Sequence, residues 1–432
     1  MFASLAHRDF RLLWAGLLLS FIGTFMQSAA LLWHVSILAP EGSRALALGF
    51  VGLSRIGPIL VFSLVSGVAA DALNRRALML ITQTLMAILA GVLAVLTLRG
   101  LTALWPIYVL AALSSAAGAF DLPARQALMP SLVPREHLPN AISMNTIAMQ
   151  TASVAGPAAG GLMIAFTSVG WVYAINAASF LFVIGALLLM KGQGATHLIA
   201  EARPAGASSR LTVAAGLEGL RFVFRAPLIR STMLLDFFAT FFSSATALLP
   251  IFAQDILHVG ARGYGWLFAA PAAGALVASG VMVTAVDAIE RRGAVLIAAV
   301  LAYGAATVAF GLSTTFWLTF ACLAVTGAAD TVSTVFRNLI RQLETPDYLR
   351  GRMTGVNMMF FMGGPQLGEL EAGLVAHWLG PVVSVVTGGL GCLAASSWLA
   401  AATPGLRRYR RTAMVAQASV LAEPTTPANP EP

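Results

Sequence analysis

The chain has 432 residues, of which 58% are hydrophobic and only 10% are charged, with a formal net charge of +8. Soluble domains carry about 25% charged residues, so this composition excludes an ordinary soluble protein and predicts an integral membrane protein. The positive charge requires no nucleic-acid partner, because basic residues beside an anionic inner leaflet account for it. The two cysteines, Cys322 and Cys392, lie far apart inside apolar segments, which argues against a disulfide framework or a thiolate metal site.

Turn and charge signals divide the chain into apolar segments of roughly 20 or more residues, the length needed to cross a hydrocarbon core of about 30 Å. The predicted spans are 10–38, 45–70, 77–98, 103–124, 140–166, 169–190, 227–256, 263–286, 293–313, 315–338, 352–378 and 381–403. We therefore predict an all-α integral membrane protein with twelve transmembrane helices in two pseudo-symmetric six-helix halves, 1–190 and 227–403. A cytoplasmic linker at 191–226, with a short surface helix near 213–224, joins the halves, and a basic then disordered tail follows at 404–432.

The distribution of basic residues predicts the orientation, because lysine and arginine are retained on the cytoplasmic side. With both termini inside, 22 of the 26 basic residues lie at cytoplasmic ends of the predicted spans. The exceptions are Arg44, Arg99 and Arg262, which fall outside, and Arg55, which lies within a span. We expect a multi-pass protein of the cell (inner) membrane, surrounded by membrane lipids, with both termini cytoplasmic.

Two short segments occur once in each predicted half. The segment 71–76 (DALNRR) returns at 287–292 (DAIERR), and each copy closes a long apolar segment that contains a glycine. The segment 156–160 (GPAAG) reappears as GPQLG at 364–368. We interpret the chain as a duplication. Duplicated hydrophobic bundles are typical of secondary transporters, which rock one half against the other around a central site.

The repeated loop resembles the signature loop of the major facilitator superfamily, which lies between spans 2 and 3 and again between spans 8 and 9. The matching residues are Gly67, Asp71, Arg75, Arg76, Gly280, Asp287, Arg291 and Arg292. The glycine–proline segments are similar to the antiporter motif of the drug-efflux branches; the residues concerned are Gly156, Pro157, Gly160, Gly161, Gly364, Pro365 and Gly368. Segments 8–14 and 123–136 resemble the branch that contains the enterobactin exporter and the macrolide efflux proteins.

The glycine–proline pairs have a physical interpretation of their own. Proline removes one helical hydrogen bond, and glycine lets another helix approach, so a bend is expected where the two halves seal. The alternative is ordinary packing of small residues. Ala152 and Ser143 stand where the antiporter motif usually has glycine, but both are small enough to keep helices close.

A second departure from the drug-efflux branch concerns coupling. The predicted span at 103–124 lacks the mid-membrane arginine that many drug–proton antiporters carry. The usual scheme of proton coupling in that branch therefore does not transfer directly to this chain.

The charged loops are expected to form ion pairs that hold in one state and break in the other. The expected pairs are Asp121 with Arg75 or Arg76, and Asp330 with Arg291 or Arg292. The family resemblance implies this charge relay, and it also implies that Asp71 faces the N-terminus of span 11, where the helix dipole favours an anion. The alternative is that the loop charges only anchor the helices in the phosphate headgroups.

Ionisable groups within the spans are the sharpest signal, because each costs about 2.5 to 3.5 kcal/mol in hydrocarbon and normally faces a cavity or a partner. The candidates for the substrate or proton pathway are Arg55, His34, Asp236, Glu369 and Glu371, with Gln27, Asn145, Gln150, Asn357 and Gln366 as polar neighbours. Glu369 and Glu371 lie about 200° apart around a helix, so only one can face the pathway, and we favour Glu369. The alternatives are a neutral glutamic acid held between helices and, for Arg55, an ion pair that fixes helix packing.

These features predict a secondary active transporter that exports a hydrophobic or amphipathic small molecule, such as a drug, a macrolide or a siderophore, by proton antiport. No nucleotide-binding loop of the Gly-x-x-x-x-Gly-Lys type is present, so protons rather than ATP or a cofactor are the expected energy source. We expect no metal, no catalytic residues and a monomer. Transport of a lysophospholipid or other lipid, and uptake by symport, are alternatives on the same fold, and a membrane enzyme or a transport-dead sensor is a further one.

Overall fold

The computed structural model describes residues 3–190, 220–243, 245–346 and 349–411. The side chains at 63–72, at 245 and at several positions between 350 and 362 are outside this description. The surroundings of the predicted switch-loop residues Gly67 and Asp71 therefore lie outside the description. Most of the predicted linker and the tail beyond 411 lie outside the described residues as well. The regular elements that are described are all helices, which confirms the predicted all-α fold.

Six long helices form an N-terminal bundle. They are α1 (Arg8–Leu38), α2 (Arg44–Ala72), α3 (Arg75–Leu98), α4 (Trp105–Leu128), α5 (Leu138–Phe166) and α6 (Val169–Leu189). Within this bundle α1 packs on α5 and α6, α3 packs on α4 and α6, and α2 packs on α4. Local sequence sets the helix ends: the Asn74 side chain accepts hydrogen bonds from the first amides of α3, and Gly100, with φ of 86°, turns the chain after it.

The remaining long helices form a C-terminal bundle. They are α9 (Pro227–Phe242), α11 (Gly260–Ala285), α12 (Arg292–Leu312), α13 (Phe316–Glu344), α14 (Arg350–Leu379) and α15 (Pro381–Ala402), and the four-residue α16 (Pro404–Arg407) follows. Here α11 packs on α13, α12 packs on α13 and α15, and α14 packs on α9 and α15. Except for α9 and α16, the ends of these helices lie within about six residues of the ends of a predicted span.

The span predicted at 227–256 differs from the others because it is broken. Helix α9 ends at Phe242, and the chain continues through a 3-10 turn and the three-residue α10 (Leu249–Ile251) into a π-helical turn, Phe252–Ile256. Pro250 has no amide hydrogen, so it cannot donate the bond that would continue a regular helix through this region. The described part of this predicted span therefore combines α, 3-10 and π turns, and its full length has the hydropathy of one membrane span.

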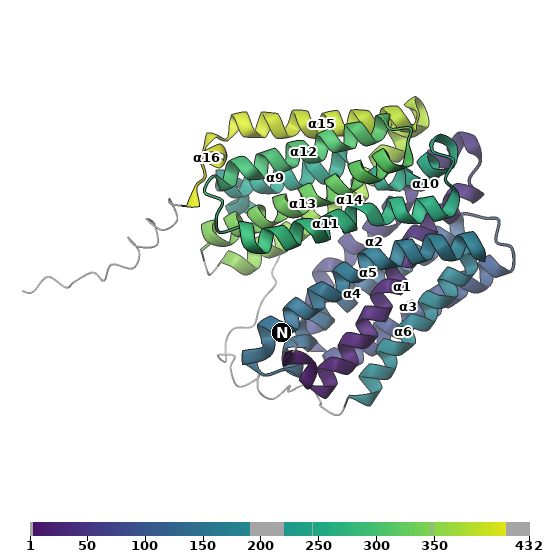
Figure 1. Cartoon of the computed structure of the whole chain (residues 1–432). Helices are drawn as coiled ribbons and strands as arrows, with labels where there is room; N and C mark the ends of the chain where they lie inside the picture. The colour runs from purple at the N-terminus through teal and green to yellow at the C-terminus, as the bar shows by residue number, and fades with distance from the viewer. Residues whose placement is uncertain (1–2, 191–219, 244, 347–348, 412–432) are drawn as a thin grey trace, which may run out of the picture.

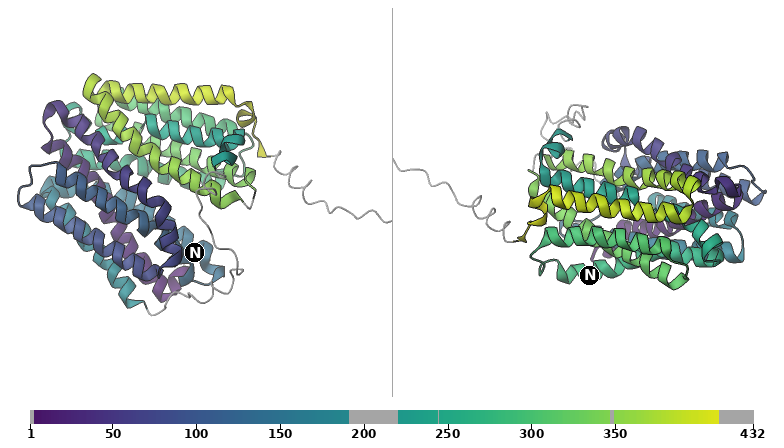
Figure 2. Two further views of the ribbon diagram at one scale, coloured as in Figure 1. Left: turned by 180° about the vertical axis from the view of Figure 1, so that it is seen from behind. Right: turned by 90° about the horizontal axis from the view of Figure 1, so that it is seen from above.

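Eleven helical stretches among the described residues have the length and hydropathy of membrane spans, and α14, with 30 residues, has the length as well. The two bundles lie side by side and are joined at one end of the molecule (Figure 1). They diverge toward the other end, which carries the N-terminus, and the view from behind shows the same divergence (Figure 2). We call these the joined end and the divergent end.

The largest hydrophobic core of the described residues crosses the joined end. It contains Leu31, Leu32 and Val35 of α1 together with Leu249 of α10 and Tyr264 of α11, each at most 2% exposed. A second core lies within the C-terminal bundle, around Leu296 and Phe336. The two bundles thus have packing of their own and share a core only where they meet.

Candidate functional site

Two pairs of helices bring the bundles into contact, α2 with α14 and α5 with α11. At both contacts glycine allows backbone to meet backbone. A Cβ atom built on Gly161 of α5 would lie 2.5 Å from Gly265 Cα of α11, and one built on Gly373 of α14 would lie 2.7 Å from Gly49 Cα of α2. Small residues permit such close helix approach, so the joined end depends on these glycines.

Polar contacts also cross between the bundles at the joined end. Tyr264 Oη donates to the Ala29 carbonyl over 2.8 Å, and Gln254 Nε2 donates to Ser36 Oγ over 2.7 Å. At the surface, Arg44 Nη1 lies 2.8 Å from Asp255 Oδ2. These bonds have direction, unlike the apolar core, so they fix how the two bundles are rotated against each other.

We predict that Gly161→Val will separate the bundles at the joined end, because the added side chain overlaps the Gly265 backbone. Spin labels on cysteines introduced at the exposed positions Gly42 and His258, one on each bundle, should then move apart in pulsed electron paramagnetic resonance. The matched control is Gly185→Val, because a Cβ atom there has no neighbour within 4 Å. Unchanged label distances in Gly161→Val would contradict the proposed packing.

Two residues of opposite charge, Glu369 of α14 and Arg55 of α2, lie near the contact between these two helices. Glu369 of α14 is 9% exposed and packs against α2, where a Cβ atom on Gly52 would lie 2.9 Å from Glu369 Oε2. Arg55 lies one helical turn further along α2 and interacts electrostatically with Glu369. Neither Glu369 Oε2 nor Gln366 Oε1 has a hydrogen-bond partner among the described residues. A buried carboxylate of one bundle therefore faces an arginine of the other across the interface.

Two tyrosines complete this central cluster. Arg55 interacts electrostatically with Tyr173 of α6 and Tyr264 of α11, and both phenol rings are fully buried. Tyr173 Oη lies 3.2 Å from Nδ1 of His34, which is 3% exposed. The sequence analysis predicted Arg55, Glu369 and His34 as pathway residues but not the tyrosines, because a tyrosine in an apolar helix forms no pattern that distinguishes it from packing.

The other predicted polar residues are distributed differently. Gln27 accepts a hydrogen bond from Asn176 Nδ2 over 2.8 Å, which ties α1 to α6. Asn145 Oδ1 on α5 is buried without a hydrogen-bond partner among the described residues, whereas Gln150 is only partly buried. Glu371 is also partly buried, on a different face of α14 from Glu369.

A second cluster of charges lies inside the C-terminal bundle and contains the predicted Asp236. Its Oδ1 atom lies 3.0 Å from Arg337 Nη2, and its Oδ2 atom lies 3.9 Å from Arg341 Nη1. Arg341 in turn donates to Oδ1 of the predicted Asn357. Asp236 is 2% exposed and Arg337 is 1% exposed, so these ions are buried. Asp236 and Asn357 thus belong to this cluster and not to the one around Glu369.

Arg337 and Arg341 lie near the C-terminal end of α13, in agreement with their predicted place at the end of a span, but both are buried, which the sequence did not predict. They are buried partners of Asp236, and Arg337 Nη2 also lies 3.2 Å from Asp330 Oδ1. A signal was present in the sequence: positions 330, 337 and 341 fall on one face of a helix, as seven- and four-residue spacings require.

The charge relay is arranged differently from the prediction. Asp121 Oδ1 accepts from Thr82 Oγ1 over 3.0 Å and from Gln83 Nε2 over 2.8 Å. Arg75 and Arg76 donate to the carbonyls of Ala127 and Leu188. Asp121 does not reach the two arginines because they lie in the first turn of α3, whereas Asp121 contacts α3 at Thr82 and Gln83, two turns further along the helix. Asp330 likewise pairs with Arg337 of its own helix rather than with Arg291 or Arg292.

The second switch loop contacts the C-terminal segment. Arg411 donates to the Asp287 carbonyl, its amide donates to the Glu290 carbonyl over 3.0 Å, and the Gly293 amide donates to the Tyr409 carbonyl over 3.1 Å. Gly280 lies on an exposed part of α11, and a Cβ atom there would meet nothing within 4 Å.

The glycine–proline motifs lie at helix contacts. A Cβ atom on Gly156 would lie 2.6 Å from Phe25 Cβ of α1, and one on Gly160 would lie 3.2 Å from the Met26 carbonyl oxygen. In the C-terminal bundle, a Cβ atom on Gly364 would lie 2.3 Å from Thr240 Oγ1 of α9. Pro157, Pro365 and Gly368 lie within α5 or α14 beside these contacts.

Comparisons with known proteins agree with this architecture. Residues 1–426 match the family model of the transmembrane secretion effectors. The enterobactin exporter of Escherichia coli O1:K1 is 28% identical over 359 residues, which cover 82% of this chain and 83% of that protein.

Among solved structures, a POT family transporter in complex with 5-aminolevulinic acid has a TM-score of 0.72 at 11% identity, over 92% of this chain and 96% of that chain. A bacterial homologue of the iron transporter ferroportin in an inward-facing state has a TM-score of 0.62 at 18% identity, over 90% and 99% of the two chains. At these identities the structures show the shared fold. The chain therefore belongs to the transmembrane secretion effector family of the major facilitator superfamily and is a multi-pass secondary transporter.

Proposed function

We propose that this protein exports a hydrophobic or amphipathic small molecule in exchange for protons, by alternating access. The observation that carries the proposal is the buried Glu369 carboxylate of α14, which packs against α2 and interacts electrostatically with the half-buried Arg55 across the interface of two bundles joined at one end only. A proton that binds to Glu369 removes the attraction to Arg55. Proton binding therefore changes the relative free energies of the joined and separated arrangements, which is the requirement for coupling.

The orientation that the arginines favour indicates which side of the membrane the divergent end faces. The loops and helix starts at the divergent end carry the basic residues Arg75, Arg76, Arg135, Arg291 and Arg292. Basic segments favour the cytoplasmic side, so the proposed conformation is open to the cytoplasm and closed to the outside. An exporter loads its substrate from the cytoplasm in such a state, and the proposed direction itself rests on the similar enterobactin exporters.

A topology experiment tests this orientation. A reporter fused after Arg411 is expected to be cytoplasmic, whereas one inserted beside Gly42, in the exposed turn between α1 and α2, is expected to be external. Reporter activity is measured as phosphatase activity, which requires export, and as green fluorescence, which requires the cytoplasm. Both reporters on the same side of the membrane would refute the proposed orientation.

The proposed substrate class rests on aromatic surface and on the relatives. Phe237 stacks on Phe241 with ring centroids 5.5 Å apart and meets Phe360 edge-on at 6.0 Å, and all three rings are only partly buried. Aromatic surface with few charges suits a bulky amphipathic compound better than a sugar or a small ion. Because similar proteins are enterobactin exporters, enterobactin is the first substrate to test, followed by macrolides and other drugs.

Reconstitution into liposomes tests the proposal directly. The expected result is uptake of labelled siderophore or macrolide into inside-out vesicles, driven by an acidic lumen and abolished when the pH gradient is collapsed. Vesicles with an equal sodium gradient, and vesicles that contain labelled lysophospholipid, serve as comparisons. Substrate transport at the same rate with and without the pH gradient would refute proton antiport. Transport of lysophospholipid but of neither siderophore nor macrolide would refute the proposed substrate class. We further propose that the protein works as a monomer without a cofactor, with protons and membrane lipids as its other partners.

A further inference from the structure

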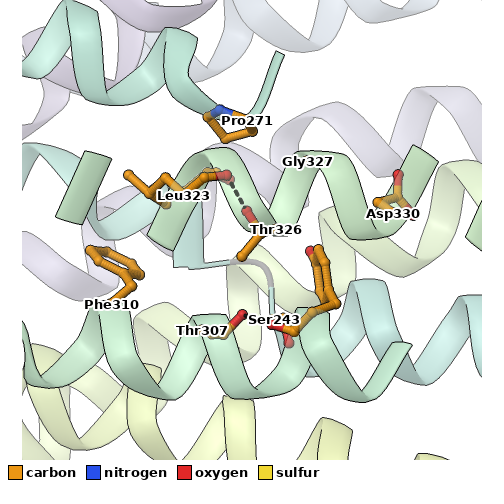
Figure 3. A pocket seen from close by; sticks show the side chains of 10 residues that line it. Ser243, Pro271, Thr307, Phe310, Leu323, Thr326, Gly327 and Asp330 are labelled. Atoms are coloured by element: carbon orange, nitrogen blue, oxygen red, sulfur yellow. Dashed lines mark hydrogen bonds between the residues drawn. The ribbon is translucent and has the colours of Figure 1, made fainter. Parts of the chain in front are cut away.

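A cavity of about 130 Å³ lies inside the C-terminal bundle, separate from the cluster around Glu369, and its lining combines the apolar residues Pro271, Phe310 and Leu323 with a group of polar side chains (Figure 3). Oxygen-bearing side chains from four helical segments surround it: Ser243, Thr246, Tyr303, Thr307, Thr326 and Asp330. A volume of this size holds about four water molecules at ~30 Å³ each, so it suits a small hydrated species and not the proposed substrate.

The hydroxyl groups around this cavity are arranged as acceptors. Thr307 Oγ1 donates its proton to the Tyr303 carbonyl over 2.9 Å, and Thr326 Oγ1 donates to the Leu323 carbonyl over 2.6 Å. A hydroxyl that has given its only proton to a carbonyl can offer just its lone pairs to the cavity. Ser243 is 6% exposed, and apart from a weak contact with the Cys392 thiol its Oγ has no hydrogen-bond partner among the described residues.

The break in the seventh span adds negative potential at the same place. Helix α9 ends at Phe242, and Ser243 is its C-terminal cap. The last turn of a helix carries carbonyl oxygens without intrahelical donors and the negative end of the helix dipole. In membrane transporters, interrupted helices whose C-terminal ends and unwound carbonyls face a cavity are typical cation sites.

The nearby side-chain charges cancel, so the acceptor oxygens and the end of α9 must supply the preference for a cation. Asp330 Oδ1 shares the Arg337 Nη2 group with Asp236, over 3.2 Å and 3.0 Å, so one guanidinium nitrogen serves two carboxylates. Arg341 balances the second carboxylate, and Tyr303 and Cys392 are the other titratable groups beside the cavity. No cluster of three or more histidine, cysteine, aspartate or glutamate residues in the described part of the chain offers a site for a multivalent metal.

We propose that this cavity binds one small monovalent cation, a sodium ion or a hydrated proton, through the Ser243, Thr307 and Thr326 hydroxyls and the Asp330 carboxylate. Both species share the chemistry that the cavity offers, which is a shell of oxygen acceptors beside the negative end of a helix. The site requires neither the proposed substrate nor the proposed direction of transport, so it can be tested without either.

The test measures binding of radioactive sodium to the full chain, purified into lipid nanodiscs, with N-methylglucamine chloride keeping the ionic strength constant. Saturable binding is expected, and Thr307→Val should weaken it about tenfold through the loss of one oxygen ligand, as should Ser243→Ala. Both changes preserve shape and remove no charge. The matched control, Thr284→Val, removes an exposed α11 hydroxyl that makes the same kind of bond to its own helix, and it should bind as the parent does.

A second measurement distinguishes the two cations. If the cavity binds a hydrated proton, sodium will not bind saturably. Proton uptake after an acid jump is then followed with an indicator dye, and the pH at which uptake is half complete is expected to shift in Thr307→Val and Ser243→Ala. These variants contain the same titratable groups as the parent, so a shift reports the cavity itself. The proposal is overturned if neither sodium binding nor the proton-uptake midpoint differs between the cavity variants and Thr284→Val, because the cavity then holds water only.

Discussion

Glu369→Gln is expected to abolish uphill export while it preserves downhill exchange of substrate. The amide has the shape of the protonated acid but cannot release a proton, so the variant can alternate between states without coupling to the pH gradient. Accumulation in vesicles should fall roughly tenfold or more, the size of a coupling free energy of about 1 to 3 kcal/mol. The measurement compares uptake driven by a pH gradient with exchange of labelled for unlabelled substrate at equal pH.

Glu371→Gln is the matched control, because Glu371 lies two residues along the same helix and only Glu369 faces Arg55. It should keep both the accumulation and its dependence on pH. The reverse result, with Glu371→Gln uncoupled and Glu369→Gln normal, would move the proton carrier to Glu371. If neither variant alters the pH dependence, the carrier is not on α14, and Asp236 is tested next.

The second large effect concerns stability. Arg337→Met should destabilise the protein by about 3 to 5 kcal/mol, because it leaves the buried Asp236 carboxylate without its closest partner. Asp236 and Arg337 are 2% and 1% exposed, so water cannot replace the lost contact. The measurement is the Tm of the purified protein in detergent, read from tryptophan fluorescence.

A double variant separates the loss of the pair from the presence of an uncompensated charge. Asp236→Asn combined with Arg337→Met removes both ions and should be more stable than Arg337→Met alone. Arg230→Met, at an exposed position near the start of α9, controls for loss of positive charge and should leave the Tm unchanged. A Tm in Arg337→Met equal to that of Arg230→Met would show that the buried pair does not contribute to stability.

The structure places Glu369 between the two bundles, and its role in the pathway stays a prediction. A charge in an apolar span must face either a cavity or a partner, so Glu369 and Arg55 were recognisable one by one. Their closeness was not recognisable, because it depends on Gly52 and Gly49 letting α2 lie against α14. The partner of Arg337 and Arg341 was not recognisable either, since an arginine near the end of a span has the same sequence signature whether it faces headgroups or a buried aspartate.

The sequence by itself determined the membrane fold, the approximate span boundaries and the duplication, because hydropathy and repeated loop motifs are properties of consecutive residues. Only the tertiary structure decided which charges meet, and that Asp121 accepts hydrogen bonds from Thr82 and Gln83. It also decided that the α-helix of the seventh span, α9, ends beside the cavity of the C-terminal bundle. The reason is that helices apolar on most of their surface carry little information about their rotation. Contacts between side chains on different helices depend on that rotation, and glycine packing at the joined end fixes it.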